Sequence, residues 1–488
     1  MDRKEKEKEK EKDKDKNEIK KDIEKKIEKL EKKNENANIK AFLTSIIVIF
    51  SLMIITFILT KIIPSGSYER TIIQGRTIID TSKPFLLKEV NFPFWKWLLS
   101  PILVLKGNST LIAIIVFLLV IGGVFNCLNK CDLMNYMLDV ITNKYGKKKY
   151  KLLYIITLFF MIMGALIGSF EECVPLVPIV VALVIGLGFD KYVGLFISIL
   201  AVGYGFSTGI TNPFTVGLAQ ELAGLPMFSG ISLRLISFVI LYILICIFIK
   251  KYAEKVDTKE TKKLDNFKID KKKQAGLYSF ITIMGIGIVA VISSGLIKSL
   301  QDYTLILVAV MFLVAGIVSP KLAGMNNKDY LREFKNGMIS MLPAVLMILM
   351  ASSIKYIMEE AMIMDTILNY FIKTAANLPK TYIILFIYLI VLIMDLFISS
   401  GSAKAFMLMP LIVPLVETYG ISTQLCVLAY AFGDGFSNIM YPTNPVLLIS
   451  LGLTKTSYRD WIKKIWKLLL ITWIITNIIL VIGLYIGY

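Results

Sequence analysis

Two stretches of the chain, about 230 residues apart, carry the same interrupted pattern. The first reads GSFEECVPLVP over Gly168–Pro178, then GYGFS over Gly203–Ser207 and TNP over Thr211–Pro213. The second reads GSAKAFMLMPLIVP over Gly401–Pro414, then GDGFS over Gly433–Ser437 and TNP over Thr443–Pro445. Paired hydrophobic segments that are broken by Gly and Pro in the two halves of a membrane protein are typical of secondary transporters and their binding sites.

The composition around these stretches is that of a membrane protein. Apolar residues make up 56% of the 488 positions, and many uncharged windows match the roughly 30 Å hydrocarbon core of a bilayer. Continuous apolar runs, rather than short alternating strands, argue against a β-barrel. We therefore expect an all-α polytopic membrane protein.

The formal net charge of +18 comes mostly from short loops between the apolar runs. Lys and Arg in such loops mark the cytoplasmic side of a membrane protein, so we expect no nucleic-acid partner. Residues 1–40 form a charged low-complexity stretch, which we interpret as a solvated cytoplasmic tail, although isoleucines at helical spacing leave an amphipathic helix open. No cleavable signal is expected there.

Several chemistries are excluded by the residues present. The five cysteines fall in or beside apolar segments, which gives no sign of disulfides. The sequence has no histidine, so His ligands, metalloprotease chemistry and His proton relays are excluded. We expect no metal site that can be assigned firmly, and no cofactor apart from Na⁺ or H⁺ as a coupling ion.

Charge placement and run length predict nine membrane-spanning helices and two re-entrant hairpins arranged as an inverted repeat. The predicted parts are the tail (1–40), a first membrane repeat (41–249), a cytoplasmic basic linker (250–276), a linking helix (277–298) and a second, inverted repeat (304–488). The hairpins are Leu152–Asp190 and Thr381–Glu417, and two full spans are the alternative for the first. The N-terminus is expected in the cytoplasm and the C-terminus outside.

The two broken segments after the hairpins, Tyr192–Phe228 and Ile421–Leu451, offer groups that could bind a ligand. The prolines remove a donor and push the preceding residue out of helical geometry. Thr211, Thr443, Asn212 and Asn444 then supply side chains, and each half-helix that starts at a proline suits a carboxylate. Freed carbonyls of the glycine motifs could hold Na⁺, and these motifs contribute Gly203, Gly205, Ser207, Gly433, Gly435 and Ser437.

Ionisable residues at membrane depth are the next candidates, because they are costly there. Glu171 and Glu172 lie at the first hairpin tip; they diverge on a helix, so one could face a cavity while the other caps a half-helix. Lys404, at the second tip, could bind a substrate carboxylate or neutralise one of the glutamates. Asp434 could complete a Na⁺ site or be a helix-end partner. We expect Asp395 to be structural.

The quoted motifs, together with GFSTGITNPFTVGLAQELAGLP and FGDGFSNIMYPTNPVL, resemble the C4-dicarboxylate anaerobic carrier family, especially its YfcC-like branch, over roughly residues 45–488. The resemblance implies an elevator-type carrier with two hairpins, in which Glu171, Glu172, Thr211, Asn212, Ser402, Lys404, Thr443 and Asn444 line the site. Relatives of that superfamily are often dimers, so a homodimer is a further expectation. PTNP stands where the branch usually has PTS, and the charged tail is not a family feature.

We therefore expect a secondary transporter in the cytoplasmic membrane of a prokaryote. It would move a small carboxylate, either a C4-dicarboxylate or an amino acid, by alternating access coupled to a cation or to counter-substrate. The alternative is a basic amino acid exchanger of the arginine/ornithine type. A membrane-embedded enzyme is disfavoured because the chain lacks His, a GxSxG elbow and a metal-ligand cluster. A channel would differ in showing flux that does not saturate.

Overall fold

The computed structural model of the protein describes most of the chain and is almost entirely helical. The described residues are 43, 45–73, 76–80, 82–145, 148–168, 170–258, 269–296 and 304–488. The predicted tail and the middle of the predicted basic linker lie outside them. Within the described residues, the only strands are short ones between Gly66 and Leu87, and every other element is a helix. This confirms the all-α class.

The first half of the chain begins with the helix Ser45–Ile62. A loop follows with strands β1 (Gly66–Ser67), β2 (Arg70–Ile73), β3 (Arg76–Ile79) and β4 (Leu86–Leu87). The helices that come next are α2 (Phe94–Leu103), α3 (Ser109–Lys130), α4 (Leu133–Tyr145), α5 (Lys149–Ile162), η2 (Met163–Ile167), η3 (Glu171–Cys173), α6 (Leu176–Gly186), α7 (Lys191–Leu195), η4 (Phe196–Leu200), α8 (Ala201–Thr208), η5 (Pro213–Gly217), α9 (Leu218–Leu222) and α10 (Ile231–Val256).

The second half repeats the order of long helix, amphipathic helix, hairpin and broken helix. Its elements are α11 (Lys271–Leu296), α12 (Thr304–Leu322), α13 (Asn327–Ser340), α14 (Leu342–Glu360), α15 (Met364–Ala375), α16 (Lys380–Asp395), α17 (Gly401–Thr418), α18 (Thr423–Asn438), α19 (Pro445–Leu453) and α20 (Tyr458–Tyr485). The predicted linking helix therefore starts earlier than residue 277, because the basic residues Lys271–Lys273 form its first turn.

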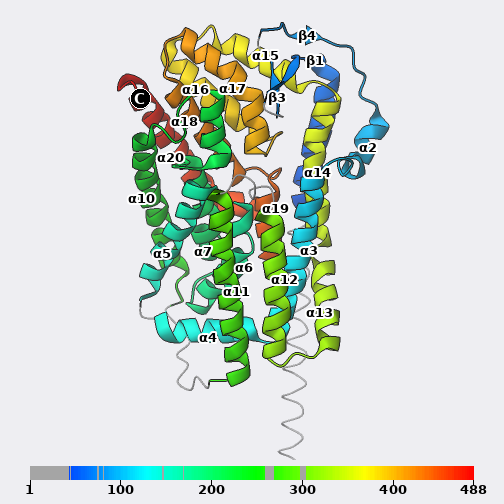
Figure 1. Ribbon diagram of the computed structural model, residues 1–488, viewed down its shortest axis with the longest axis vertical. Helices are drawn as coiled ribbons and strands as arrows, with labels where there is room; N and C mark the ends of the chain where they lie inside the picture. The colour runs from blue at the N-terminus through cyan, green and yellow to red at the C-terminus, as the bar shows by residue number, and fades with distance from the viewer. Residues whose placement is uncertain are drawn as a thin grey trace, which may run out of the picture.

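The elements are arranged along one long axis (Figure 1). Helix α4 lies across one end, while α15, the strands and the C-terminus lie at the other. Helices α16–α18 belong to the C-terminal end, α5–α7 to the α4 end, and α19 lies between the two groups. The helices of the two predicted hairpins thus lie toward opposite ends of the molecule (Figure 1).

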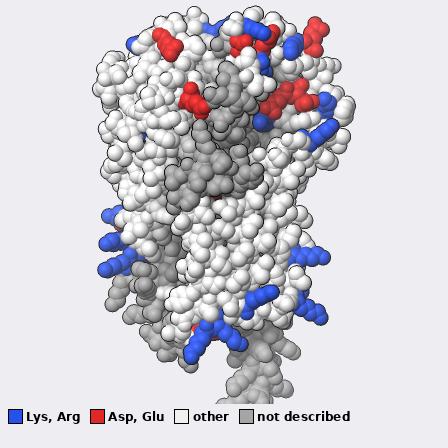
Figure 2. Space-filling view, in the orientation of Figure 1, with Lys and Arg blue, Asp and Glu red and all other residues white. Residues whose placement is uncertain are grey.

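Charged side chains follow the same axis (Figure 2). On the visible face, Lys and Arg gather toward the α4 end with few acidic neighbours, whereas both signs are present at the C-terminal end. The described surface between the two ends is mostly uncharged on this face. An apolar belt between two polar ends is what a bilayer requires.

Within the described residues, eight helices are long and apolar enough to cross a membrane. Two of them, Lys149–Ile167 and Gly401–Thr418, are arms of the predicted hairpins. Three predicted spans, Leu277–Leu296, Thr304–Ser319 and Ile421–Leu451, are helical but lie outside this set. Helix length alone does not distinguish a re-entrant hairpin from a full membrane span, so the number of membrane crossings stays a prediction.

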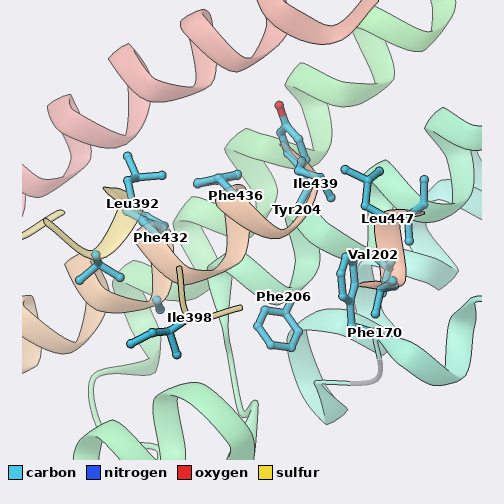
Figure 3. Close-up of a cluster of buried hydrophobic side chains, with 14 of the residues drawn as sticks. Phe170, Val202, Tyr204, Phe206, Leu392, Ile398, Phe432, Phe436, Ile439 and Leu447 are labelled. Atoms are coloured by element: carbon cyan, nitrogen blue, oxygen red, sulfur yellow. The ribbon is translucent and has the colours of Figure 1, made fainter. Parts of the chain in front are cut away.

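The two broken helices cross at their glycine motifs and form the centre of the core. A Cβ on Gly435 would lie 2.3 Å from both the Cα and the Oγ of Ser207, and a Cβ on Gly205 would lie 1.9 Å from the carbonyl oxygen of Met161. Aromatic rings close the crossing: Tyr204 and Phe436 have ring centroids 5.3 Å apart (Figure 3). The segment Lys191–Leu222 is completely buried over its most apolar window.

The loop after the first helix connects the two halves at the C-terminal end. The Gly66 N–H donates to the carbonyl of Met362 at 2.8 Å, and the Tyr68 N–H donates to Asp365 Oδ2 at 3.0 Å. Arg70 forms an ion pair with the other oxygen of Asp365 at 2.9 Å. These contacts lie on α15 and the turn before it, so the first half of the chain is attached to the second far from the breaks.

Candidate substrate and ion site

The first break is capped by the asparagine before the proline. Asn212 is fully buried, and its Oδ1 accepts the N–H groups of Phe214 at 2.9 Å and Thr215 at 3.3 Å. Pro213 occupies the first helical position of η5, where its missing N–H costs nothing. The Nδ2 of Asn212 and the Oγ1 of Thr215 are buried without a partner in the described structure, so both could bind a ligand.

The tip of the first hairpin holds this break in place. The Thr211 N–H donates to the Ala165 carbonyl at 3.0 Å, and the Thr211 hydroxyl donates to the Leu166 carbonyl at 2.9 Å. Gly168 has a φ of +74°, and a Cβ there would lie 2.3 Å from Asn212 Oδ1. Only a glycine fits this close approach in a left-handed conformation. The hairpin tip and the TNP break therefore form one unit.

The second break has the same kind of asparagine cap, and a second asparagine, Asn438, also takes part in it. Asn444 Oδ1 accepts the N–H of Leu447 at 3.1 Å at the start of α19, and its Nδ2 donates to Asn438 Oδ1 at 2.6 Å. Thr443 Oγ1 is buried without a partner in the described structure. Asn438 was not predicted as a site residue, although its place directly after the second GxGFS motif is visible in the sequence.

The tip of the second hairpin reaches the first break. The Ser402 hydroxyl donates to the Phe214 carbonyl at 3.3 Å, and a Cβ on Gly401 would lie 3.1 Å from Thr215 Cγ2. On the other side of the tip, the Tyr430 hydroxyl of α18 donates to the Gly401 carbonyl. The predicted site residues Thr211, Asn212 and Ser402 are thus brought together by segments almost 200 residues apart.

Lys404 is buried between two carboxylates. Its ammonium donates to Asp395 Oδ1 and lies 2.8 Å from Asp434 Oδ1, and all three side chains have an exposed fraction of 0%. The expected pairing of Lys404 with a hairpin glutamate is wrong, because α16 and α18 supply the acids that are within reach. Asp395, which we expected to be structural, belongs to this buried cluster. We call Asp395, Lys404 and Asp434 the buried triad.

The two glutamates of the first hairpin diverge as predicted. Glu171 lines a small pocket together with Pro445, Val446 and Ile449 of α19 and two residues of α3. Glu172 is half-buried, and its Oε2 has no partner in the described structure. The expected cap by one of them is not observed, since neither η3 nor α6 has a side-chain cap. Glu171 instead points to the start of the second half-helix.

The glycine motifs have a different role from the expected one. Gly203 and Gly205 lie inside α8, and Gly433 and Gly435 lie inside α18. The carbonyls of Gly203 and Gly433 accept the hydroxyls of Ser207 at 2.7 Å and Ser437 at 2.5 Å. The expectation of freed glycine carbonyls is therefore wrong: the motifs permit close helix crossing, and both serines are bonded within their own helices. A Na⁺ site near them stays a prediction.

A larger cavity of about 460 Å³ lies beside α20 and borders the second break at Met440 and Tyr441. It is lined mainly by aromatic and aliphatic side chains, among them Tyr388, Phe436, Tyr441, Trp466 and Trp473. No predicted site residue lines it, and Trp466 and Trp473 are about half exposed on the outer face of α20. Its apolar lining fits a surface that contacts lipid better than it fits a site for a charged solute.

The chain is similar to two bacterial proteins over most of its length. It is 27% identical to "Putative basic amino acid antiporter YfcC" of Escherichia coli, over 91% of this chain and 96% of that protein. It is 24% identical to an uncharacterised protein of Haemophilus influenzae, over 77% of this chain and 76% of that one.

Two solved structures match with low sequence identity. The YdaH transporter of Alcanivorax borkumensis aligns with a TM-score of 0.43 at 16% identity, covering 92% of this chain and 99% of its own. MtrF of Neisseria gonorrhoeae aligns with a TM-score of 0.42 at 15% identity, covering 91% and 96%.

A family model extends over most of the chain, including both hairpins and both breaks. It is described as C4-dicarboxylate anaerobic carrier, and it matches residues 42–485. This agrees with the resemblance of the GSFEECVPLVP and TNP motifs. The protein is therefore a multi-pass membrane protein of a transporter family, and it belongs to the C4-dicarboxylate anaerobic carriers.

Proposed function

We propose that the protein is a secondary active carrier of a small carboxylate, either a C4-dicarboxylate or an amino acid. One observation carries this proposal: two half-helices, each started by an Asn-Pro pair and capped by its asparagine, meet the hairpin tips in the interior. Broken helices at membrane depth are tolerated where they line a binding cavity. The catalytic features of an enzyme are not needed to explain this arrangement.

The carboxylate is placed at the start of α19. The N–H groups at a helix start and the helix dipole both favour an anion. Three polar atoms near the breaks are buried and unpartnered within the described structure: Asn212 Nδ2, Thr215 Oγ1 and Thr443 Oγ1. A bound carboxylate could accept hydrogen bonds from all three, and an amino group could donate to the two threonine hydroxyls, which gives each atom a reason to be left free by the protein.

A second candidate, exchange of basic amino acids, is favoured by the charge around the hairpins and breaks. Asp395 and Asp434 are buried acids, Glu172 is half-buried and Glu171 is exposed, and Lys404 is the single base among these positions. With all of them ionised the sum is −3, from four negative charges and one positive. Such a region attracts a cation, either on the substrate or as a coupling ion.

Transport would proceed by alternating access. Each half supplies one hairpin and one broken helix in the same order, and α4 and α15 lie at opposite ends of the molecule, as an inverted repeat requires (Figure 1). The Lys/Arg-rich α4 end then faces the cytoplasm, and the C-terminus lies outside. Re-entry of both hairpins and assembly as a homodimer belong to the same proposal.

Counterflow in proteoliposomes tests the transport function. Vesicles are preloaded with unlabelled succinate or arginine or left empty, and uptake of the same labelled compound is measured. Transient accumulation only in preloaded vesicles establishes a carrier and fixes the substrate class. Uptake that does not saturate and ignores the internal compound would indicate a channel and contradict the proposal.

A further inference from the structure

We infer that the buried triad is the proton-binding site of the carrier, and that its two carboxylates share one proton. This rests on the proposed function, because it names the coupling ion of that carrier. Two carboxylates and one ammonium leave a charge of −1 on three side chains that are all fully buried. An uncompensated charge at membrane depth is costly, and one bound proton removes it.

The contacts within the triad leave room for a proton on either carboxylate. Asp395 Oδ1 accepts a hydrogen bond from the Lys404 ammonium, and Asp434 Oδ1 lies 2.8 Å from the same nitrogen. The Oδ2 atoms of Asp395 and Asp434 are both buried without a partner in the described structure. One ammonium thus serves two buried carboxylates, which favours the sharing of one proton between them.

The surroundings of the triad contain several further titratable groups. Glu171 and Tyr430 interact electrostatically with Asp434, and Tyr441 interacts with Asp395. Of all these neighbours, Lys404 alone is a base. The acids around the triad therefore outnumber its single base, which favours uptake of a proton by the cluster.

A proton fits the site better than a metal ion does. Lys404 Nζ already occupies the position between the two carboxylates where a cation would bind, so Na⁺ would meet a positive charge at its own site. Within the described residues, no group of three His, Cys, Asp or Glu side chains could hold a metal. A proton needs only one free carboxylate oxygen, and the Oδ2 atoms of Asp395 and Asp434 both have no partner in the described structure.

The first half of the chain shows that the fold does not require this triad. Tyr204 stands in GYGFS where Asp434 stands in GDGFS, and its hydroxyl is paired with Thr472 at 2.6 Å. Glu171 stands three residues after Gly168, where Lys404 stands three after Gly401. At the position that corresponds to Asp434, the first half thus uses the uncharged pair Tyr204–Thr472. The charges of the triad are therefore not required for the fold and are available for function.

Proton flux during transport is the first test. In vesicles loaded with a pH indicator, we expect addition of the transported compound to move protons with the wild-type protein and with Asp434→Glu. With Asp434→Asn we expect the flux, and accumulation driven by a pH gradient, to fall by roughly tenfold or more, because the remaining Asp395–Lys404 pair is neutral and needs no proton. Asp365→Asn, which removes a buried acid paired with Arg70, is the matched control and should retain coupling.

Infrared spectroscopy tests the site without relying on transport. We expect the wild-type protein in lipid to show the band of a protonated carboxylic acid that disappears as pH rises. Asp434→Asn should lack that component, and Asp365→Asn should keep it. An identical band in wild type and Asp434→Asn would overturn the inference, as would Na⁺-driven accumulation that ignores a pH gradient. Absence of counterflow with an intact band would refute the transport proposal alone.

Discussion

At the scale of single residues, the most informative pair is Asn212 and Asn444. Each satisfies N–H groups that would otherwise be exposed where a helix restarts inside an apolar environment. A buried polar atom without a partner in the described structure lies at each break. It is the Nδ2 of Asn212 itself at the first break and the Oγ1 of Thr443, the residue before Asn444, at the second. A residue that both builds the break and borders the free polar groups is expected to matter more for transport than for stability.

Replacing Asn212 or Asn444 by alanine should abolish counterflow while the protein stays folded and inserted in the membrane. Loss of a helix cap costs about 1 kcal/mol, which is too little to unfold the protein. Asn326→Ala is the control, because Asn326 caps α13 through the Asp329 N–H at 2.8 Å, far from the breaks. Equal transport by all three variants would contradict the site assignment.

Replacing Lys404 by methionine should lower the stability of the protein strongly. The change leaves Asp395 and Asp434 buried without their base, and breaking a buried pair costs about 3–5 kcal/mol. Thermal unfolding in detergent measures the effect. Lys96→Met, which removes a half-exposed pair with Glu360, should cost less than about 1 kcal/mol. A similar melting temperature for both variants would show that the triad is not an ion pair.

At the scale of secondary-structure elements, the crossing of α8 and α18 determines where the breaks lie. Gly435 lets α18 approach the backbone of α8 at Ser207, and Gly205 lets the same helix α8 approach the backbone of α5 at Met161. Small residues at helix interfaces are a common means of close packing in membranes. The sequence motif GxGFS therefore specifies a packing contact. The candidate binding residues Thr211, Asn212, Thr443 and Asn444 lie four to seven residues after the end of each motif.

Gly205→Ala and Gly435→Ala should each destabilise the protein by roughly 1–3 kcal/mol or more, because the added methyl group meets backbone atoms. Gly285→Ala is the matched control in α11: nothing lies within 4 Å of its Cβ position. Alanine there should be neutral or stabilise by up to about 1 kcal/mol. Urea or thermal unfolding of the three variants checks the difference, and equal stabilities would argue against a close crossing.

The sequence predicts the elements well and their contacts poorly. Prolines 213 and 445 and the asparagines before them mark both breaks, because their effect on the backbone is local. The partners of Lys404 could not be predicted in the same way. Asp395 is nine residues away and Asp434 is 30 residues away, and only the folding of α16, α17 and α18 brings them to one point. Asn438 and Thr215 were missed for the same reason.

At the scale of the whole molecule, the unequal distribution of charge has a testable consequence for orientation. Lys and Arg near the α4 end should hold that end in the cytoplasm, and the C-terminus after α20 should lie outside (Figures 1 and 2). A cleavable C-terminal tag should be removed from intact spheroplasts by added protease, whereas an N-terminal tag should be protected. Protection of the C-terminal tag would mean that the orientation is the reverse of the predicted one, or that the number of membrane crossings is different.

The crossing of the two halves also has a consequence for biosynthesis. Gly435 is translated about 230 residues after Ser207, its contact on the first broken helix, so at roughly 5–20 residues per second that helix waits about 10–50 s for its partner. During that interval the segment Lys191–Leu222, whose most apolar window is completely buried in the finished protein, has no second half to cover it. Insertion must therefore retain an incomplete chain at the translocon, and a truncated first half should be a substrate for membrane proteases.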